Sequence, residues 1–327
     1  MNTQRILITG ANGYLGAQLS TYFAQKGHSI TALCFPEIPK DANWCASMNE
    51  VLVGSIAEDS TIERLAQYDF DAIIHLVSLD HHQSAIASTP DVLKVNVQPA
   101  WRLLETFAPK GLKTFLFFST IHVYGALPVV RVSESYPTSP ANVYALTHLL
   151  TEQVCDYFNR TSEVNCLTAR LSNSYGEPVF PENNCWWLAV NDLCRMAYYD
   201  KCIRLLSDGS PQRDFIHGSD VCRAVDVLLT AAPKDVAHST FHVSSSKTHS
   251  LLELAGMVQS VYLETYGERL VVSTPLQEAV SDFDRYAEVD TYTIDNTALR
   301  SLGFENLVDL KAGIRQLFSY FDSRAHA

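Results

Sequence analysis

Three glycines spaced three residues apart lie near the start of this 327-residue chain, where residues 9–16 read Thr-Gly-Ala-Asn-Gly-Tyr-Leu-Gly. Gly10 can take a tight turn, Gly13 lets the backbone approach a pyrophosphate, and Gly16 lets a helix pack closely against a sheet. The helix expected at 14–25 would offer free N–H groups and a positive dipole end to the phosphates. The spacing therefore predicts a dinucleotide-binding turn, and three turn glycines without a ligand are the alternative.

The elements expected around this turn alternate between short buried strands and amphipathic helices. Strands separated by helices imply right-handed crossovers and a parallel sheet. The sequence therefore predicts an α/β fold with a Rossmann-type, doubly wound parallel sheet. The expected strands span 5–9, 29–35, 51–53, 71–77, 113–118 and 164–171, and the expected helices span 14–25, 91–107 and 144–158.

The alternation changes after about residue 171, which indicates a second, smaller part of the chain. We expect residues 1–171, with about 214–244, to form a dinucleotide-binding Rossmann domain. Residues of about 172–213 and 245–327 are expected to form an interleaved C-terminal α/β lobe that binds the substrate. Within these segments, the pattern predicts an apolar helix at 186–199, a helix after Gly218, a strand at 241–243 and a helix from Leu251.

The charge balance excludes several kinds of partner. Lys and Arg number 24 against 36 Asp and Glu, a net charge of −12, and hydrophobic residues make up 47% of the chain. Such a composition predicts a folded chain without the clustered cations of a nucleic-acid surface. No apolar run approaches the roughly 18 residues of a membrane span, and the N-terminal residues do not resemble a signal peptide. We expect a soluble, cytoplasmic protein with no nucleic-acid or membrane partner.

Neither the cysteines nor the histidines predict a metal site. The eight cysteines are scattered without a CxxC pair, which favours reduced thiols that fill the core. Asp80, His81 and His82 are types that bind metals, but adjacent histidines rarely share one metal ion comfortably. We therefore expect no metal.

Several further motifs occur in a fixed order along nearly the whole chain. Together they resemble the extended short-chain dehydrogenase/reductase family, which contains nucleotide-sugar epimerases and dehydratases. None of them is specific for one substrate. The motifs are GxxGxxG from Gly10, HLVS from His75, Asn96, SxxxVYG from Ser119, Tyr144, RLSNSYG from Arg170 and RDFIHGSD from Arg213.

The resemblance implies a catalytic group of Thr120, Tyr144 and the residue four positions after the tyrosine. Thr120 would hydrogen-bond the substrate oxygen, and the Tyr144 phenol would exchange the hydroxyl proton. The family carries Lys at the third position, where this chain has His148. An imidazole is shorter and only partly charged at neutral pH. We expect His148 to replace the ribose contact and to lower the phenol pKa less fully; an ordinary helix histidine in an inactive protein is the alternative.

The resemblance also implies which residues contact the nicotinamide cofactor. The residue that ends the second strand is acidic in many NAD sites, but here it is Cys34, for which a plain core thiol is an equal alternative. Lys26 is the only Lys or Arg between Ala11 and Pro39, so we favour NAD, with NADP left open. The expected contacts are Gly10, Gly13, Tyr14, Leu15, Gly16, Cys34, Ser55, Ile56, Leu76, Val77, Ser78, Asn96, Tyr144, His148 and Leu171.

The residues after Thr120 narrow the reaction. Family members that dehydrate sugars resemble one another in carrying Asp-Glu there, whereas this chain has Ile121 and His122. Isoleucine cannot exchange protons, which disfavours 4,6-dehydration, and the Cys expected of a 3,5-epimerase is absent. The reaction type that remains is oxidation or reduction at one carbon of the sugar. His122 either contacts the sugar or packs as an ordinary surface histidine.

The resemblance places the diphosphate of a nucleotide sugar against Asn173, Asn184 and Arg213. Arginine suits this role because its planar fork grips phosphate oxygens in pairs. The alternative for Arg213 is a salt bridge to Asp214 or Asp220. For Trp186 and Trp187, we expect core packing in preference to base stacking.

These residues predict an enzyme that transfers hydride between a nicotinamide cofactor and a hydroxyl or keto carbon of a nucleoside-diphosphate sugar, with C4 favoured. Its product would serve polysaccharide or glycoconjugate precursor synthesis. One alternative is a one-way NAD(P)H-dependent ketoreductase of a nucleotide keto-sugar, and another is a catalytically decayed dinucleotide-binding regulator. The helices at about 91–107 and 144–160 correspond to the dimer interface of the family, which implies a homodimer.

Overall fold

A parallel sheet of seven strands runs through the computed structural model, which describes residues 3–128, 130–231, 239–281, 283 and 291–325. The strand order is β3-β2-β1-β4-β5-β7-β11, and every neighbouring pair is parallel. The order reverses between β1 and β4, and ligands of such sheets bind at the carboxyl ends beside this point. The strands are β1 Arg5–Thr9, β2 Ser29–Cys34, β3 Glu50–Val53, β4 Ala72–His75, β5 Thr114–Thr120, β7 Asn165–Leu171 and β11 Thr240–Val243.

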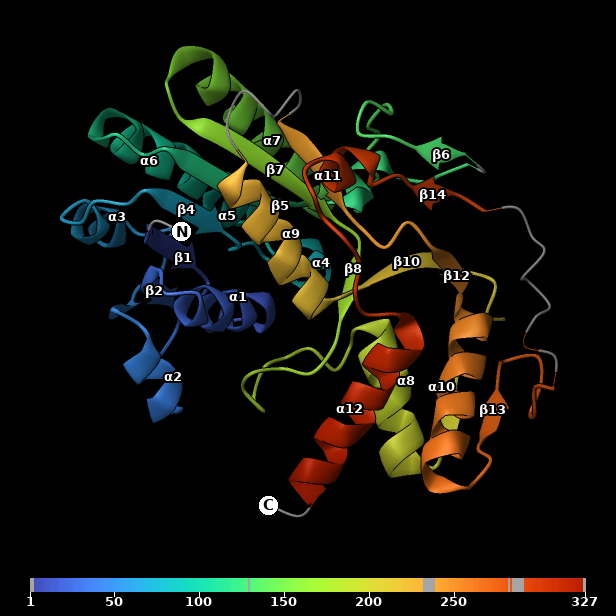
Figure 1. The fold of residues 1–327 in the computed structure, drawn as a ribbon. Helices are drawn as coiled ribbons and strands as arrows, with labels where there is room; N and C mark the ends of the chain where they lie inside the picture. The colour runs from blue at the N-terminus through green and yellow to red at the C-terminus, as the bar shows by residue number, and fades with distance from the viewer. Residues whose placement is uncertain (1–2, 129, 232–238, 282, 284–290, 326–327) are drawn as a thin grey trace.

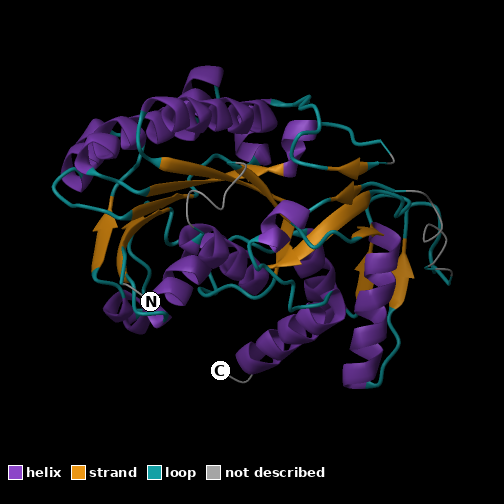
Figure 2. Cartoon of the chain, turned by 45° about the horizontal axis from the view of Figure 1, so that its top comes forward, coloured by secondary structure: helices purple, strands orange, loops and turns teal. Residues whose placement is uncertain are grey.

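Helices cover both faces of this sheet (Figure 2). Along β1, Ile6 and Ile8 pack on one face, whereas Leu7 packs on the other, because successive side chains of a strand alternate. Both faces are therefore buried, and the expected Rossmann-type α/β fold is confirmed. One face is covered by α1 Tyr14–Gln25, α2 Ala42–Ser47, α9 Gly218–Thr230 and α11 Thr297–Ser301, and the other by α3 Asp59–Leu65, α6 Gln98–Phe107 and α7 Val143–Thr161.

A second group of elements lies beside the sheet, with α8, α10 and α12 packed together (Figure 1). It has its own apolar core, in which Tyr262, Phe318 and Phe321 are almost fully buried. Its elements are β8 Asn173–Tyr175, β10 Gln212–His217 and β12 Thr248–Ser250 in one sheet, β9 Cys202–Arg204 with β13 Val271–Ser273 in another, and the helices α8 Ala189–Arg195, α10 Leu251–Tyr266 and α12 Leu310–Ala325.

The expected segment 214–244 contributes to both groups of elements. Its strand β11 completes the large sheet and α9 packs against α1, whereas β10 pairs with β8 and β12 in the smaller sheet. The domain boundaries stay a prediction. Two smaller features lie near the site: the helix α4 His81–Ile86, and a short pair formed by β6 Arg131–Val132 and β14 Thr293–Ile294.

Two expected helices differ from those in the structure. The stretch expected as one helix at 91–107 is two, α5 Thr89–Asn96 and α6, with a break at Val97. Pro99 lies in the first turn of α6 and has no backbone N–H, so a continuous helix would lack a hydrogen bond there. The helix expected at 186–199 begins only at Ala189, in α8.

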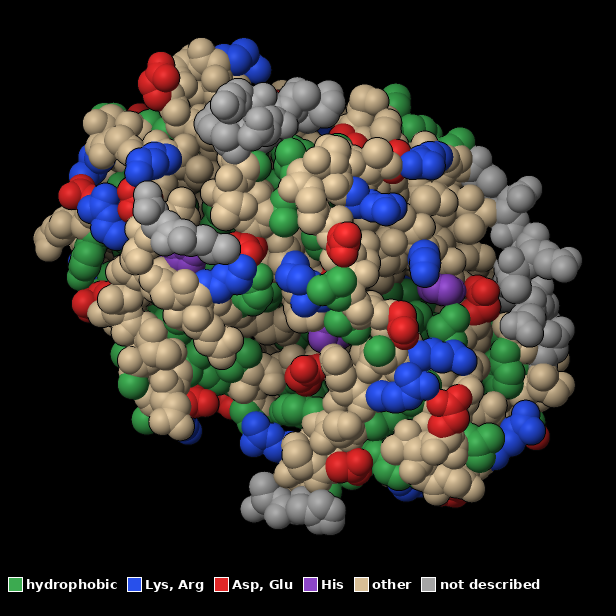
Figure 3. All heavy atoms as spheres, in the orientation of Figure 1, with side chains coloured by type: hydrophobic (Ala, Val, Ile, Leu, Met, Phe, Trp, Pro, Cys, Tyr) green, Lys and Arg blue, Asp and Glu red, His purple; other side chains and the backbone are tan. Residues whose placement is uncertain are grey.

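The surface and the thiols add two observations. On the face drawn in Figure 3, Lys and Arg side chains are interspersed with Asp and Glu and do not form one basic patch. All eight cysteines are free, and six of them are buried. Within the described ranges, no helix is both long and apolar enough to cross a bilayer.

Candidate active site

The glycine turn joins the carboxyl end of β1 to α1 at the point where the strand order reverses. Gly10 has a φ of +71°, a conformation that favours glycine, and the Gly13 N–H donates to its carbonyl oxygen at 2.9 Å. A Cβ atom at Gly16 would lie 2.1 Å from that same oxygen, so only glycine fits there. The first turn of α1 carries no acidic residue, so its N–H groups and dipole suit a phosphate.

A cavity of about 260 Å³ lies against this turn and reaches the phenol of Tyr144. It has the phosphate-binding turn along one part of its wall and a proton-exchanging side chain along another, so its residues fit a dinucleotide. Among the expected residues, its lining includes Gly10, Gly13, Tyr14, Leu15, Gly16, Leu76, Ser78, Tyr144, His148, Leu171 and Asn184.

Five expected cofactor contacts are not among the residues that line this cavity. Cys34 is fully buried in the core, and burial raises the pKa of its thiol to about 12. Ile56 packs in the core on the other face, and the Val77 side chain lies beside Gly10. The Asn96 side chain accepts from the Leu79 N–H at 2.7 Å and donates to the Thr147 hydroxyl at 2.9 Å. The Ser55 hydroxyl accepts from the Ala57 N–H at 3.3 Å. Cofactor contacts by these five residues stay predictions.

Lys26, the single Lys or Arg between Ala11 and Pro39, lies away from the glycine turn. Lys26 forms a salt bridge with Asp226, near the far end of α1 from the glycine turn. The segment after β2 is held instead by Asn12, whose side chain donates to the Phe35 carbonyl at 2.9 Å and accepts from the Phe35 N–H at 3.2 Å.

Of the two hydroxyls expected to be catalytic, Tyr144 lines the cavity, whereas Thr120 is buried next to it and lines neither this cavity nor a second one beyond the phenol. Thr120 ends β5, and Tyr144 lies in the first turn of α7, which the Asn142 side chain caps by accepting from the Ala145 N–H at 2.9 Å. Burial raises the pKa of the Tyr144 phenol to about 12, and a hydrogen bond with the Thr120 hydroxyl opposes part of that rise. The phenol is therefore protonated at neutral pH in the free chain.

His148 lies against the same phenol ring but supplies no positive charge. Its ring centroid is 4.2 Å from that of Tyr144, and its Nδ1–H donates to the Tyr144 carbonyl oxygen at 2.8 Å. Burial lowers the pKa of His148 to about 4, so the partial charge expected from an imidazole is absent at neutral pH. Its contact with the cofactor ribose stays a prediction.

A buried ion pair fixes α7 against the strands that carry the site. Glu152, about two turns after Tyr144 and one turn after His148, binds the Arg170 guanidinium at 2.6 Å and accepts from the Ser119 hydroxyl. Arg170 lies on β7, and Ser119 precedes Thr120 on β5. Because all three side chains are nearly inaccessible, this pair sets the position of the phenol relative to the Thr120 hydroxyl.

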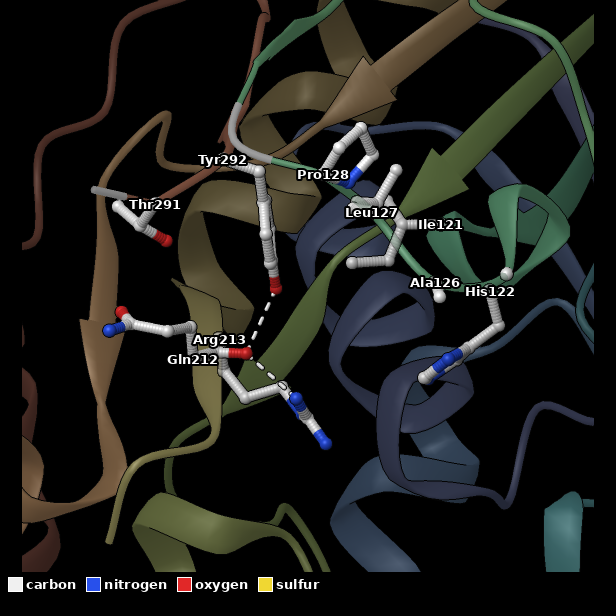
Figure 4. A pocket seen from close by; sticks show the side chains of 10 residues that line it. Ile121, His122, Ala126, Leu127, Pro128, Gln212, Arg213, Thr291 and Tyr292 are labelled. Atoms are coloured by element: carbon white, nitrogen blue, oxygen red, sulfur yellow. Dashed lines mark hydrogen bonds between the residues drawn. The ribbon is translucent and has the colours of Figure 1, made fainter. Parts of the chain in front are cut away.

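A second cavity of about 380 Å³ opens beyond Tyr144. His122 and Arg213 point into it from opposite walls, with Ile121 and Tyr292 also lining it (Figure 4). The His122 ring is also 6.3 Å from the Tyr144 ring, which joins this cavity to the phenol. Although His122 is exposed to the open cavity, lost solvation lowers its pKa, and the positive charge of Arg213 lowers it further.

Among the described residues, no carboxylate forms a salt bridge with Arg213, which lines this cavity. Its guanidinium donates to the carbonyl oxygen of Gln212 at 2.7 Å. The expected alternative, a salt bridge to Asp214 or Asp220, is wrong for this structure: Asp214 accepts from the backbone N–H groups of Ser245 and Lys247, and Asp220 pairs with Arg223.

The two asparagines expected at the diphosphate differ in position. The Asn173 amide donates to the Asp214 carbonyl at 2.9 Å and lines neither of the two cavities in the described structure. Asn184 lines the cofactor-side cavity, on a segment tied to the glycine turn by the Asn183 amide, which donates to the Asn12 carbonyl at 2.8 Å. Diphosphate contacts by Asn173 and Asn184 stay predictions.

The cavity wall also contains residues that sequence reasoning missed. Asp80 caps α4, with its carboxylate accepting from the Gln83 N–H at 2.8 Å, and its charge opposes ionisation of Tyr144. The Asp-x-x-Gln spacing is a capping signal that could have predicted this helix start. The other missed lining residues are Phe118, Ser119, Ser174, Trp187 and Leu188.

Comparisons with known proteins give sequence matches along most or all of the chain. Residues 6–243 match the sequence profile described as the NAD dependent epimerase/dehydratase family. A dTDP-glucose 4,6-dehydratase of Streptomyces niveus is 24% identical, with 98% of this chain and 94% of that protein covered. A UDP-glucose 4-epimerase of Mycolicibacterium smegmatis is also 24% identical, with 98% and 99% covered.

A solved structure shares the same fold. The UDP-glucose 4-epimerase of Thermotoga maritima, crystallised with UDP-glucose, superposes with a TM-score of 0.80 at 21% sequence identity. The match covers 98% of this chain and 99% of that one. At this level of sequence identity, the match shows that the two proteins share a fold.

Proposed function

Because the chain belongs to the NAD-dependent epimerase/dehydratase family, we propose that it oxidises and reduces C4 of a nucleoside-diphosphate sugar, with epimerisation at that carbon as the net reaction. The observation that carries this proposal is the Tyr144 phenol, which hydrogen-bonds with the Thr120 hydroxyl and lines the cavity against the glycine turn, and whose ring is 6.3 Å from that of His122 in the cavity containing Arg213. Enzymes of this family use NAD, which accepts and returns hydride when bound.

The roles of the site residues follow from their chemistry. The Thr120 hydroxyl binds the sugar oxygen and orients it toward the phenol. Tyr144 in its ionised form takes the proton of the C4 hydroxyl when the carbon is oxidised, and the phenol so formed returns that proton to the oxygen when the carbon is reduced. The buried Glu152–Arg170 pair fixes the Thr120 and Tyr144 hydroxyls relative to each other. To invert the configuration at C4, the keto-sugar must rotate between the two steps so that hydride returns to its opposite face. The second cavity supplies space for this rotation beside the phenol.

The nucleoside diphosphate is assigned to the cavity that contains Arg213. Two relatives in the comparison bear names of enzymes that act on dTDP-glucose or UDP-glucose, and a guanidinium forms paired hydrogen bonds with phosphate oxygens. Asn184, which lines the neighbouring cavity against the glycine turn, is the second proposed diphosphate contact. Asn173 would have to exchange its bond to the Asp214 carbonyl for one to the ligand.

A one-way ketoreductase is the second candidate, and the uncharged His148 favours it. Without a neighbouring cation the phenol stays protonated at neutral pH, which suits donation of a proton to a keto oxygen better than removal of one from a hydroxyl. A dinucleotide-binding regulator that has lost catalysis would keep the glycine turn and its cavity but would not alter any sugar.

One absorbance experiment separates these functions. Purified protein is incubated with UDP-glucose, dTDP-glucose or GDP-mannose and with their 4-keto forms, while the reduced nicotinamide is followed near 340 nm and sugars are identified by NMR. An epimerase converts the sugar with no net change in absorbance. A reductase consumes one NADH for each keto-sugar, and a regulator binds NAD but leaves every sugar unchanged, which would contradict the proposal.

We also propose that the protein is a homodimer formed through α6 and α7. These helices expose several large apolar side chains: Trp101 at 40%, Leu146 at 45%, Leu150 at 40% and Tyr157 at 43%. Exposed apolar groups on adjacent helices are typical of an interface. Light scattering after gel filtration tests the assembly: the wild type should have twice the chain mass, and Leu146→Glu with Leu150→Glu should give a monomer. A monomeric wild type would refute it.

A further inference from the structure

Two adjacent tryptophans take opposite positions beside the site. Trp186 packs into the core of the smaller group of elements, with ring centroids 6.0 Å from Tyr320 and 5.5 Å from Phe321. Trp187 is 50% exposed and lines the cavity that contains Tyr144. The expectation of core packing is therefore right for Trp186 and wrong for Trp187. A large aromatic ring left half-exposed in a cavity wall loses the free energy of burial unless a ligand covers it.

Contacts from two parts of the fold hold the Trp187 ring in place. Its indole N–H donates to the carbonyl oxygen of Asn184 at 2.9 Å, which fixes the ring to the 184–188 segment. From the other side, the His82 ring meets it edge-on, with centroids 6.2 Å apart and an interplanar angle of 88°. The indole is therefore pre-positioned, and little side-chain freedom remains to be lost on binding.

A row of aromatic rings connects Trp187 to the catalytic phenol. His82 is next to His81, and the two rings are 5.7 Å apart. His81 in turn contacts Tyr144 edge-on at 6.4 Å. Trp187 and Tyr144 therefore line the same cavity and are linked through the two histidine rings at the start of α4.

We propose that Trp187 is the platform on which the sugar ring of the substrate rests, and that it selects sugars by the shape of the face they present. A pyranose carries C–H bonds on its faces, and the electron-rich face of an indole attracts such weakly positive hydrogens. A sugar seated there has its far edge directed toward Thr120 and Tyr144. An axial hydroxyl on the stacked face would hold the sugar away from the ring. This inference rests on the proposed function.

Fluorescence of the NAD-loaded protein tests the platform directly. The chain contains four tryptophans, and a sugar that covers Trp187 changes its emission. UDP-glucose, dTDP-glucose and GDP-mannose are titrated into the wild type, Trp187→Phe, Trp187→Ala and Trp101→Phe. We expect the nucleotide sugar that binds to change the emission of the wild type and Trp101→Phe, and not that of the two position-187 variants.

Affinity provides the second readout, measured by calorimetry on the same proteins. Trp187→Ala should weaken binding of the nucleotide sugar about tenfold and Trp187→Phe about threefold, because the smaller ring keeps part of the stacking. Affinity for NAD and the melting temperature should not change. In turnover, the loss should raise KM more than it lowers kcat.

The outcomes separate this inference from the function on which it rests. Equal sugar affinity in the wild type and Trp187→Ala would overturn the platform and leave the proposed function standing. An emission change produced by NAD alone, together with weaker NAD binding in Trp187→Ala, would place the nicotinamide on the indole and also overturn it. If no nucleotide sugar binds and no hydride transfer occurs, both proposals fail.

Discussion

His148 donates from Nδ1 to the backbone carbonyl oxygen of Tyr144 at 2.8 Å while its ring lies 4.2 Å from the phenol ring. That hydrogen bond fixes the proton of the neutral imidazole on Nδ1 and leaves only Nε2 free to accept. Burial lowers the pKa of His148 to about 4, so the side chain nearest to the phenol packs against it without a charge. A phenol in this position lacks the cation that would favour its ionised form.

Restoring a cation at this position should shift the pH dependence of sugar oxidation. In His148→Lys, a positive charge beside Tyr144 should lower its pKa from about 12 by roughly 1–3 units. The rate of oxidation, measured by nicotinamide absorbance, should then rise at lower pH than in the wild type. His148→Gln is the matched uncharged control and should keep the wild-type profile. Identical profiles in all three proteins would remove position 148 from the control of the phenol.

Acid should destabilise the protein through its buried histidines. The folded-state pKa of His148 is about 4 and that of His75 about 3, both because of burial, whereas a histidine of the unfolded chain titrates near 6.5. Below that pH the unfolded chain takes up protons that the folded chain does not. Stability is therefore complete above about pH 6.5 and falls as pH decreases toward 4, with about 2 kcal/mol lost from each histidine by pH 5.

Urea unfolding at pH 7 and pH 5 measures this loss. His148→Gln should reduce the difference between the two pH values by about 2 kcal/mol, whereas His82→Gln, at an exposed position, should not. If His148→Gln keeps the full difference, His148 is not buried in its neutral form.

Alanine at two positions of the glycine turn should separate folding from phosphate binding. In Gly16→Ala the new Cβ would lie 2.1 Å from the Gly10 carbonyl oxygen, so the turn and α1 must move apart and the melting temperature should fall. In Gly13→Ala that distance is 3.1 Å, which the fold can accommodate, but the methyl group occupies the approach to the pyrophosphate. We expect Gly13→Ala to melt near the wild type and to bind NAD at least about tenfold more weakly by calorimetry. Undiminished NAD affinity in Gly13→Ala would place the phosphates elsewhere.

Removing the guanidinium of Arg213 should weaken nucleotide-sugar binding and little else. Arg213→Ala deletes a side chain bonded to its neighbour's carbonyl, so the fold should be unaffected. Affinity for the nucleotide sugar should fall by about tenfold or more, since a charged hydrogen bond contributes roughly 1.5–3 kcal/mol. NAD affinity should not change. Arg131→Ala, which removes an exposed guanidinium paired with Asp295, is the matched control. Equal effects of the two substitutions would contradict a diphosphate at Arg213.

The fold was largely predictable because its strongest signals are local. The strand Arg5–Thr9 and the helix Tyr14–Gln25 have the expected bounds, since an apolar run, three glycines and a helical period agree there. The family was predictable for the same reason, as the motifs occur in a fixed order. The break at Val97 was missed although Pro99 marks it, because the apolar period continues through both helices.

The site was predictable in its residues and less so in their electrostatics. The spacing of Tyr144 and His148 places them on one helix face, but the charge of an imidazole depends on its burial. Part of that burial comes from Phe117 on strand β5, which packs against the His148 ring and is distant from it in the sequence. The separate positions of Trp186 and Trp187 were likewise unpredictable, because they depend on elements distant in the sequence: α12 packs against Trp186, and His82 contacts Trp187.

Hydride transfer by Tyr144→Phe tests the central claim most directly. The substitution keeps the ring that packs on His148 and removes only the hydroxyl that exchanges the proton. With NAD and a nucleotide sugar that the wild type converts, we predict single-turnover hydride transfer, followed near 340 nm, to slow by about 10²–10⁴-fold while NAD affinity and the melting temperature stay unchanged. Transfer at the wild-type rate in the folded, NAD-bound variant would show that the phenol at position 144 is not the acid–base group.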